Sequence, residues 1–166
     1  MAVICGAGCQ QSNSGTHEVA RIDWKEMQAN GSLKGKLLAP DEGEKYGHVI
    51  KIDSPLKVGT ADGKAVTMPV LEMKAPEITQ QMFSLSGWVR HDKIQDGAYL
   101  EMWVVFPNGT SYFTRTLADS GPMGQFKGSS DWRRIELPFQ MEAGPNAARP
   151  KEILLNVCFK GLEHCG

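Results

Sequence analysis

The stretch Gly97–Thr116, GAYLEMWVVFPNGTSYFTRT, decides the fold, because it places two runs of strand-forming residues on either side of Pro107-Asn108-Gly109. Val, Phe, Tyr, Trp and Thr fit a pleated strand, and an Asn-Gly pair tolerates the positive φ that a tight hairpin turn requires. The stretch therefore predicts a β-hairpin that turns at residues 107–109.

Similar strand-like runs recur along the chain, at residues 48–52, 65–75, 83–91, 98–106, 110–117, 132–139 and 152–159. The segments between them are rich in Gly, Pro, Asp, Asn and Ser, which favour turns. No segment keeps a 3.6-residue period over three turns, and RIDWKEMQAN at 21–30 is short enough to be one turn of helix or an irregular lead-in. This pattern predicts an all-β protein, an antiparallel β-sandwich or barrel, with a single domain over residues 19–166.

Composition bounds the partners of this chain. It has 166 residues, of which 41% are hydrophobic and 22% are charged, as in an ordinary globular domain. The formal net charge of −1 creates no general attraction for nucleic acid or for an anionic membrane surface, so we expect no nucleic-acid partner. No apolar run approaches the roughly 20 residues that a membrane-spanning helix needs.

The first fifteen residues, MAVICGAGCQQSNSG, combine a short apolar segment, small residues and Cys9 before a polar tail. They resemble the end of a bacterial lipoprotein signal, although the basic n-region is missing and the apolar segment is short. We expect residues 1–18 to be a signal remnant or a flexible tether. The resemblance implies lipidation at Cys9, a location in the bacterial cell envelope or periplasm, and membrane contact only through a lipid anchor. The alternative is that Cys9 is an ordinary cysteine in a flexible tail.

The cysteines leave one pairing open. If Cys5 is removed with a signal and Cys9 carries lipid, Cys158 and Cys165 remain outside the cytoplasm and could form a disulfide. The alternative is two free thiols. The chain has no Cys-x-x-Cys motif and its four histidines are scattered, so we expect no zinc site.

Loop aspartates offer the other potential metal ligands. Asp53, Asp62 and Asp131 could help to hold a structural calcium ion, but they have no regular ligand spacing. We therefore predict no cofactor.

Successive side chains point to opposite faces of a sheet, so alternation assigns residues to a core face and a second face. In 98–106 the core face is Ala98, Leu100, Met102, Val104 and Phe106. A buried unpaired arginine is costly, so we place Arg115 on the second face, paired with Glu101. The second faces of the predicted strands mix aromatic and polar residues: Trp88, Arg90, Tyr99, Glu101, Trp103, Arg115, Trp132, Arg134 and Asn156.

Over residues 65–161, the order of FSLSGWVRHDKI, GAYLEMWVVFPNGTSYFTRTL, GPMG, GSSDWRRIELPF and EILLNVCFKG resembles jelly-roll domains of the galactose-binding-like kind. The chain is most similar to uncharacterised bacterial envelope proteins with that fold, which resembles that of carbohydrate-binding modules. The resemblance implies a two-sheet β-sandwich that often binds carbohydrate and is often reduced to a structural accessory domain. In such domains one more strand follows the penultimate one, whereas GLEHCG leaves no room for it here. We therefore expect a jelly roll that lacks its last strand, with an exposed sheet edge near residues 153–159 where a protein partner could pair.

Sugar binding needs aromatic rings that stack on the C–H face of a pyranose and polar groups that bond its hydroxyls. The nine second-face residues supply both, so we predict a non-catalytic carbohydrate-binding module. The alternative is a structural or protein-interaction domain of a lipoprotein with no glycan ligand. We do not expect an enzyme: Glu101 and Glu136 share a predicted face, but each has arginines close by and is better explained as an ion-pair partner.

Overall fold

The computed structural model describes residues 2–6, 18, 21–33, 36–38, 48–55, 65–142 and 148–161. These residues form one short helix and eight strands, and every strand pairing is antiparallel. The prediction of an all-β, antiparallel protein is confirmed. The elements are β1 (Ala2–Gly6), α1 (Trp24–Ala29), β2 (Lys36–Leu38), β3 (Val49–Ile52), β4 (Val66–Lys74), β5 (Met82–Val105), β6 (Ser111–Arg115), β7 (Phe126–Gln140) and β8 (Glu152–Phe159).

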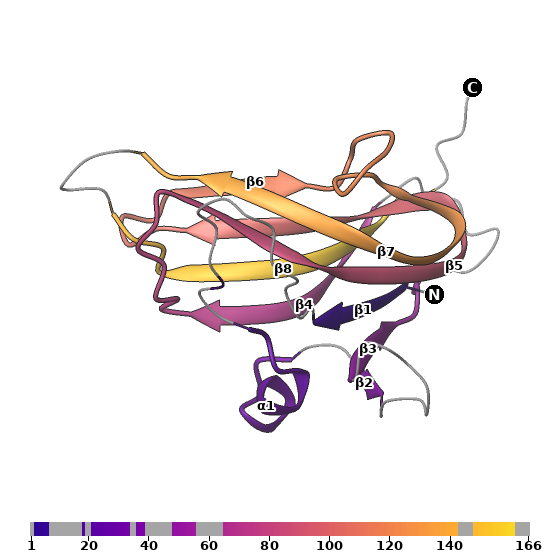
Figure 1. The fold of residues 1–166 in the computed structure, drawn as a ribbon, viewed down its shortest axis with the longest axis horizontal. Coiled ribbons are helices and arrows are strands. Elements are labelled where there is room, and N and C mark those ends of the chain that lie inside the picture. The colour runs from indigo at the N-terminus through magenta and orange to yellow at the C-terminus, as the bar shows by residue number, and fades with distance from the viewer. Residues whose placement is uncertain are drawn as a thin grey trace.

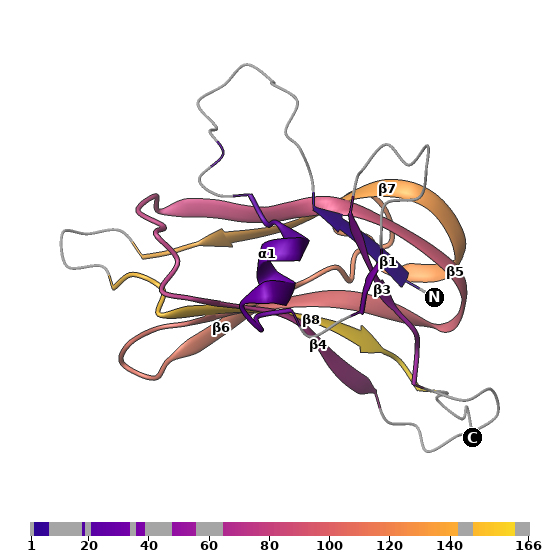
Figure 2. The same cartoon turned by 90° about the horizontal axis from the view of Figure 1, so that it is seen from below.

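The 24-residue strand β5 organises the molecule, because four other strands pair with it directly. Its N-terminal arm, residues 82–91, lies between β1 and β7, and its C-terminal arm, residues 98–105, lies between β8 and β6. Outside these neighbours the order is completed by β3 and β2 beyond β1, and by β4 beyond β8. Figures 1 and 2 show β5 folding back at the right-hand edge of the molecule.

The fold-back corrects the prediction of two separate strands at 83–91 and 98–106. The pairing of β5 with β7 continues through the bend with register shifts between Val89 and Ala98. Lys93 and Gly97 adopt φ values of 53° and 100°, and such local irregularities bend a strand without ending it. Ser129 of β7 holds the bend: its Oγ accepts a hydrogen bond from Lys93 N at 3.0 Å and donates one to Asp92 Oδ1 at 2.7 Å. Because β7 pairs with β5 through the bend, β7 begins at residue 126, six residues before the predicted start.

The β5–β6 connection confirms the predicted hairpin. Phe106 N donates to Thr110 O at 2.9 Å, and Gly109 N donates to Phe106 O at 3.0 Å. Gly109 has a φ of 85°, the left-handed conformation that glycine adopts without a steric penalty. The Asn108 side chain closes the turn, accepting from both Thr110 N at 3.0 Å and Thr110 Oγ1 at 2.7 Å.

Strand β8 is not at a sheet edge, so the prediction of an exposed edge near residues 153–159 is wrong. β8 pairs with β5 on one side and with β4 on the other along its whole length. The chain order does not reveal this arrangement, because β4 comes some eighty residues before β8 in the sequence. Side-chain alternation assigns faces to each strand but does not say which strands are neighbours. Within the described sheet, β4 and β6 flank this part of the fold.

The N-terminal segment also differs from the expectation of a tether over residues 1–18. Ala2–Gly6 form β1, which pairs with β3 and with the N-terminal arm of β5. Cys9 lies outside the described residues, so its lipidation stays a prediction.

Helix α1 has six residues, so the helical alternative for residues 21–30 is confirmed. Asp23 caps it, since its Oδ1 accepts from Lys25 N at 2.9 Å and from Glu26 N at 3.2 Å. The helix buries Trp24 against the core and lies below the strands in Figure 1.

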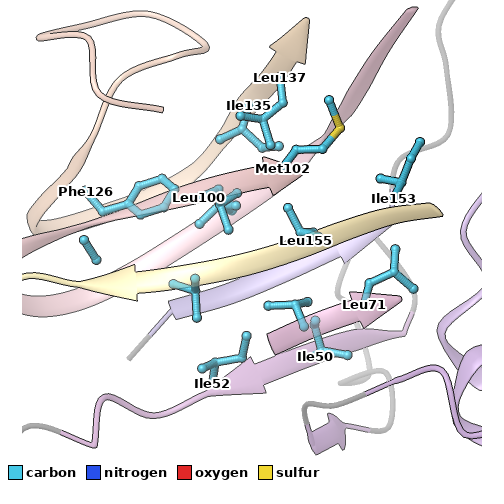
Figure 3. Close-up of a cluster of buried hydrophobic side chains, with 14 of the residues drawn as sticks. Ile50, Ile52, Leu71, Leu100, Met102, Phe126, Ile135, Leu137, Ile153 and Leu155 are labelled. Atoms are coloured by element: carbon cyan, nitrogen blue, oxygen red, sulfur yellow. The ribbon is translucent and has the colours of Figure 1, made fainter. Parts of the chain in front are cut away.

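Buried side chains from both arms of β5 join one hydrophobic core, part of which Figure 3 shows. The predicted core face of residues 98–106 is confirmed, because Ala98, Leu100, Met102 and Val104 are fully buried and Phe106 is 8% exposed. Truncating one such large side chain to alanine typically costs about 2–5 kcal/mol. Members of the core on other elements include Ile50, Ile52, Val70, Leu71, Val89, Ile94, Phe126, Ile135, Leu137, Ile153, Leu155, Val157 and Phe159.

Candidate functional site

The second face of the C-terminal half of the sheet gathers aromatic and polar side chains from three strands. Cross-strand register places Glu101 of β5 between Arg115 of β6 and Asn156 of β8, and Trp103 beside Phe113. Residues directly opposite each other in an antiparallel pair share a face. We call the surface formed by Tyr99, Glu101, Trp103, Phe113, Arg115 and Asn156 the aromatic–polar face.

Glu101 is the centre of this face and is buried, with 5% of its surface exposed. Its Oε2 accepts a hydrogen bond from Arg115 Nε at 2.6 Å, and its Oε1 accepts one from Trp103 Nε1 at 2.6 Å. The predicted Glu101–Arg115 pair is therefore confirmed. Because both carboxylate oxygens are engaged, Glu101 positions its two neighbours.

Arg115 lies between two aromatic rings. Its guanidinium carbon is 4.0 Å from the ring centroid of Phe113 and 5.7 Å from that of Tyr99. The side chain is 32% exposed, and its Nη1 and Nη2 atoms make no hydrogen bond to a residue that the structure describes. Arg115 therefore presents hydrogen-bond donors in a fixed orientation beside aromatic surface.

Phe113 extends the aromatic surface. Its ring lies 5.0 Å from that of Trp103 at an interplanar angle of 56°, and the residue is 49% exposed. Phe113 is not among the predicted site residues; the signal that could have found it is Arg115, which lies two positions along β6 and therefore shares its face.

Tyr99 and Cys158 adjoin the buried side of the face. Tyr99 is the cross-strand partner of Cys158, whose Sγ lies 3.5 Å from Thr67 Oγ1. Burial is the main cause that raises the pKa of both Tyr99 and Cys158, so both are protonated at neutral pH. Cys158 is a buried free thiol, which is the second of the two alternatives for this cysteine, and Cys165 lies outside the described residues.

Two carboxyl groups meet at the β4 side of the same sheet. Glu152 of β8 lies near Glu72 of β4, and Lys74 Nζ lies 3.2 Å from Glu72 Oε1. Burial and the neighbouring Glu72 carboxylate raise the pKa of Glu152. The positive charges of Lys74 and Lys151 lie near these two carboxyl groups and oppose the rise in the pKa of Glu152.

The other four predicted site residues form a separate group on the N-terminal arm of β5 and on β7. Trp88 is the cross-strand partner of Arg134, and the Arg90 guanidinium carbon lies 5.1 Å from the ring centroid of Trp132. The nine candidates thus fall into two groups, one on each arm, because the bend in β5 divides what alternation alone treats as one surface.

The carboxylates considered for glycoside hydrolysis are both in ion pairs. Glu101 binds Arg115, as described, and Glu136 Oε2 lies 3.8 Å from Arg134 Nη2. These positions agree with the interpretation of both residues as ion-pair partners.

The potential calcium ligands do not converge within the described part of the chain. Asp53 pairs with Lys51 at 3.4 Å, Asp131 Oδ1 accepts from Trp132 N at 2.7 Å, and Asp62 lies outside the described residues. No group of three or more His, Cys, Asp or Glu side chains is placed to hold a metal ion in the part of the chain that the structure describes.

Among the described residues, no helix is long and apolar enough to cross a membrane.

Comparisons with known proteins assign no family and no function to this chain. The chain matches no protein-family model, no curated protein and no solved structure.

Proposed function

We propose that this protein is a non-catalytic carbohydrate-binding module of the bacterial envelope, and that the aromatic–polar face binds the glycan. We further propose that its topology is a jelly-roll β-sandwich of the galactose-binding-like kind, and that Cys9 is the site of a lipid anchor, in which case signal cleavage removes β1 from the mature sheet. The observation that carries the binding proposal is the fixed position of Arg115 between Phe113 and Tyr99.

The physical support is the combination of two kinds of surface. A pyranose ring offers a C–H face that stacks on an aromatic ring, and hydroxyls that accept hydrogen bonds from a guanidinium group. Phe113 and Trp103 supply the rings, while the unengaged Nη atoms of Arg115 supply donors next to them. The Glu101 carboxylate holds Arg115 before any ligand arrives, which reduces the entropy lost on binding.

A glycan panel tests this proposal. We expect at least one oligosaccharide to change the Trp fluorescence of the protein, and Phe113→Ala to abolish that change while leaving the fold intact. Tyr112→Ala is the matched control: Tyr112 is the next residue on β6, is 54% exposed, and packs on the opposite side near Phe106 and Phe139. If no glycan in the panel binds, or if the two variants behave alike, the proposal is wrong.

A structural or protein-interaction role is the second candidate, and exposed apolar side chains around β6 favour it. Met82, Tyr112, Phe113 and Leu117 are each more than 40% exposed, and large apolar side chains at the surface gain free energy when a partner removes them from water. In that case alanine at Trp103 and Arg115 would impair assembly with the partner. In the glycan case the same variants would lose ligand binding without changing assembly.

The envelope location has its own test. Intact-mass spectrometry of the protein expressed from its native gene should show a lipid-modified cysteine at position 9. An unmodified Cys9 would exclude the lipid anchor and leave the binding proposal unaffected.

A further inference from the structure

A cleft beside the bend of β5 is separate from the aromatic–polar face. Its volume is about 500 Å³, within the range typical of small-molecule sites. Three segments line it: β5 through His91, the connection between β6 and β7 through residues 119–125, and the first part of β7 through Lys127, Ser130, Arg133 and Arg134.

Arg133 holds the wall of this cleft in place. Its Nη1 donates to Gly121 O at 3.2 Å, and its Nη2 donates to Gly124 O at 2.7 Å and to Gln125 O at 3.1 Å. Its guanidinium carbon lies 4.8 Å from the ring centroid of Phe126. The connection between β6 and β7 is thereby fixed to β7, so the cleft is formed in advance.

The charge of the cleft is opposite to that of the whole chain. Three cationic side chains, Lys127, Arg133 and Arg134, and one carboxylate, Asp119, line it, whereas the chain carries a net charge of −1. Cations that converge in a partly enclosed space raise the local concentration of anions.

Two of these cations have donors to spare. The Lys127 side chain makes no hydrogen bond or ion pair with any residue that the structure describes. The Arg134 side chain is 57% exposed, and its ion pair with Glu136 is long, at 3.8 Å. A charge-assisted hydrogen bond to a ligand oxyanion would be shorter and stronger than that contact.

His91 adds an acceptor. Its Nδ1 lies 3.1 Å from Gly128 O, and because a carbonyl only accepts, Nδ1 carries the proton of that bond. Burial lowers the pKa of His91, so the ring is neutral at physiological pH and Nε2 is an acceptor. Nε2 has no hydrogen bond to a described residue, which leaves it able to accept from a ligand hydroxyl.

We propose that this cleft binds a small hydroxylated oxyanion, of the class of a uronic acid or a phosphorylated or sulfated monosaccharide. Lys127 and Arg134 hold the anionic group, and His91 accepts a hydrogen bond from a hydroxyl group. The proposal concerns residues other than those of the aromatic–polar face and does not rest on the function proposed for that face.

Calorimetric titration at low ionic strength tests this site, with glucuronate, glucose 6-phosphate and glucose 6-sulfate as probes and glucose as the neutral comparison. We expect at least one anionic probe to bind and glucose to bind at least roughly tenfold more weakly. The anionic probe that binds best identifies the oxyanion as carboxylate, phosphate or sulfate. Lys127→Gln and Arg134→Gln should each weaken binding roughly tenfold, as expected for the loss of one charge-assisted hydrogen bond.

Two controls keep the result specific. Lys151→Gln removes an exposed cation that does not line the cleft and should leave binding unchanged, and Phe113→Ala should also leave it unchanged. Thermal unfolding of each variant establishes that it is folded. Absence of binding by all three anionic probes, equal binding of glucose, or equal loss in Lys151→Gln and Lys127→Gln would overturn the proposal.

Discussion

Replacing Glu101 by alanine should destabilise the fold strongly, because this buried carboxylate accepts two short hydrogen bonds. Each bond is charge-assisted, and removal of a hydrogen bond to a charged group costs about 1.5–3 kcal/mol. The total is reduced because the Arg115 side chain is 32% exposed and water can solvate it once its partner is gone. We therefore expect the free energy of unfolding to fall by about 3 kcal/mol, at the lower end of the range for breaking a buried ion pair.

Glutamine at position 101 separates charge from shape. The amide keeps one acceptor oxygen, but its NH₂ group must face either Arg115 Nε or Trp103 Nε1, and both of these are donors. One donor is then left without an acceptor, so Glu101→Gln should lower the free energy of unfolding by about 2 kcal/mol. This loss approaches that of the alanine variant, although glutamine has nearly the same size as glutamate.

Urea unfolding of the purified variants measures these differences, and thermal unfolding checks them. For a domain of this size, about 3 kcal/mol corresponds to a decrease in Tm of roughly 6–12 °C. Glu136→Ala is the matched control, since its ion pair is 3.8 Å long and more exposed, and we expect a cost below about 1 kcal/mol. If Glu101→Ala is no more destabilising than Glu136→Ala, the central role given to Glu101 is refuted.

Three further changes test other parts of the structure. Thr116 is fully buried and its Oγ1 accepts from Leu100 N at 2.8 Å, so Thr116→Val should lower the free energy of unfolding by about 1–3 kcal/mol, whereas Thr116→Ser should cost less in the same urea titration. Burial lowers the pKa of His91 below its ordinary 6.5, so the unfolded chain binds the proton more tightly than the folded protein does. The free energy of unfolding should therefore fall as the pH drops from 6.5 through the lowered pKa, and in His91→Gln it should fall less over the same pH range. Cys158 is buried and its pKa is raised by that burial, so a thiol reagent should modify Cys158 only after unfolding in urea. Peptide mapping that finds Cys158 modified in the folded protein would contradict that expectation.

Much of the C-terminal half could be predicted from local sequence. Period-two alternation assigned Leu100, Met102 and Val104 to the core, since each residue's face depends only on its neighbours along the strand. The pairing of Arg115 with Glu101 followed from the cost of burying a lone charge.

The bend and the strand order could not be predicted in this way. Lys93 adopts a positive φ because Ser129, thirty-six residues further along, accepts the hydrogen bond from its amide. Nothing near residues 92–97 in the sequence distinguishes this bulged strand from a turn. The division of the candidate site into two groups depends on that bend, and the cleft depends on the segments that the bend brings together. Neither feature can therefore be predicted from side-chain alternation within single strands.

The position of β8 between β4 and β5 has a consequence for how the chain folds during synthesis. Among the described residues, β4 pairs only with β8, apart from an isolated bridge between Leu71 and Leu33, so it cannot join the described sheet until residues 152–159 have left the ribosome. The pairing of β4 with β8 therefore has to wait for contacts between residues about ninety positions apart, such as Thr67 and Cys158. Chains dominated by such distant contacts fold slowly and expose unpaired strands while they wait. A nascent chain of this protein thus depends on protection from aggregation until residues 152–159 have been synthesised.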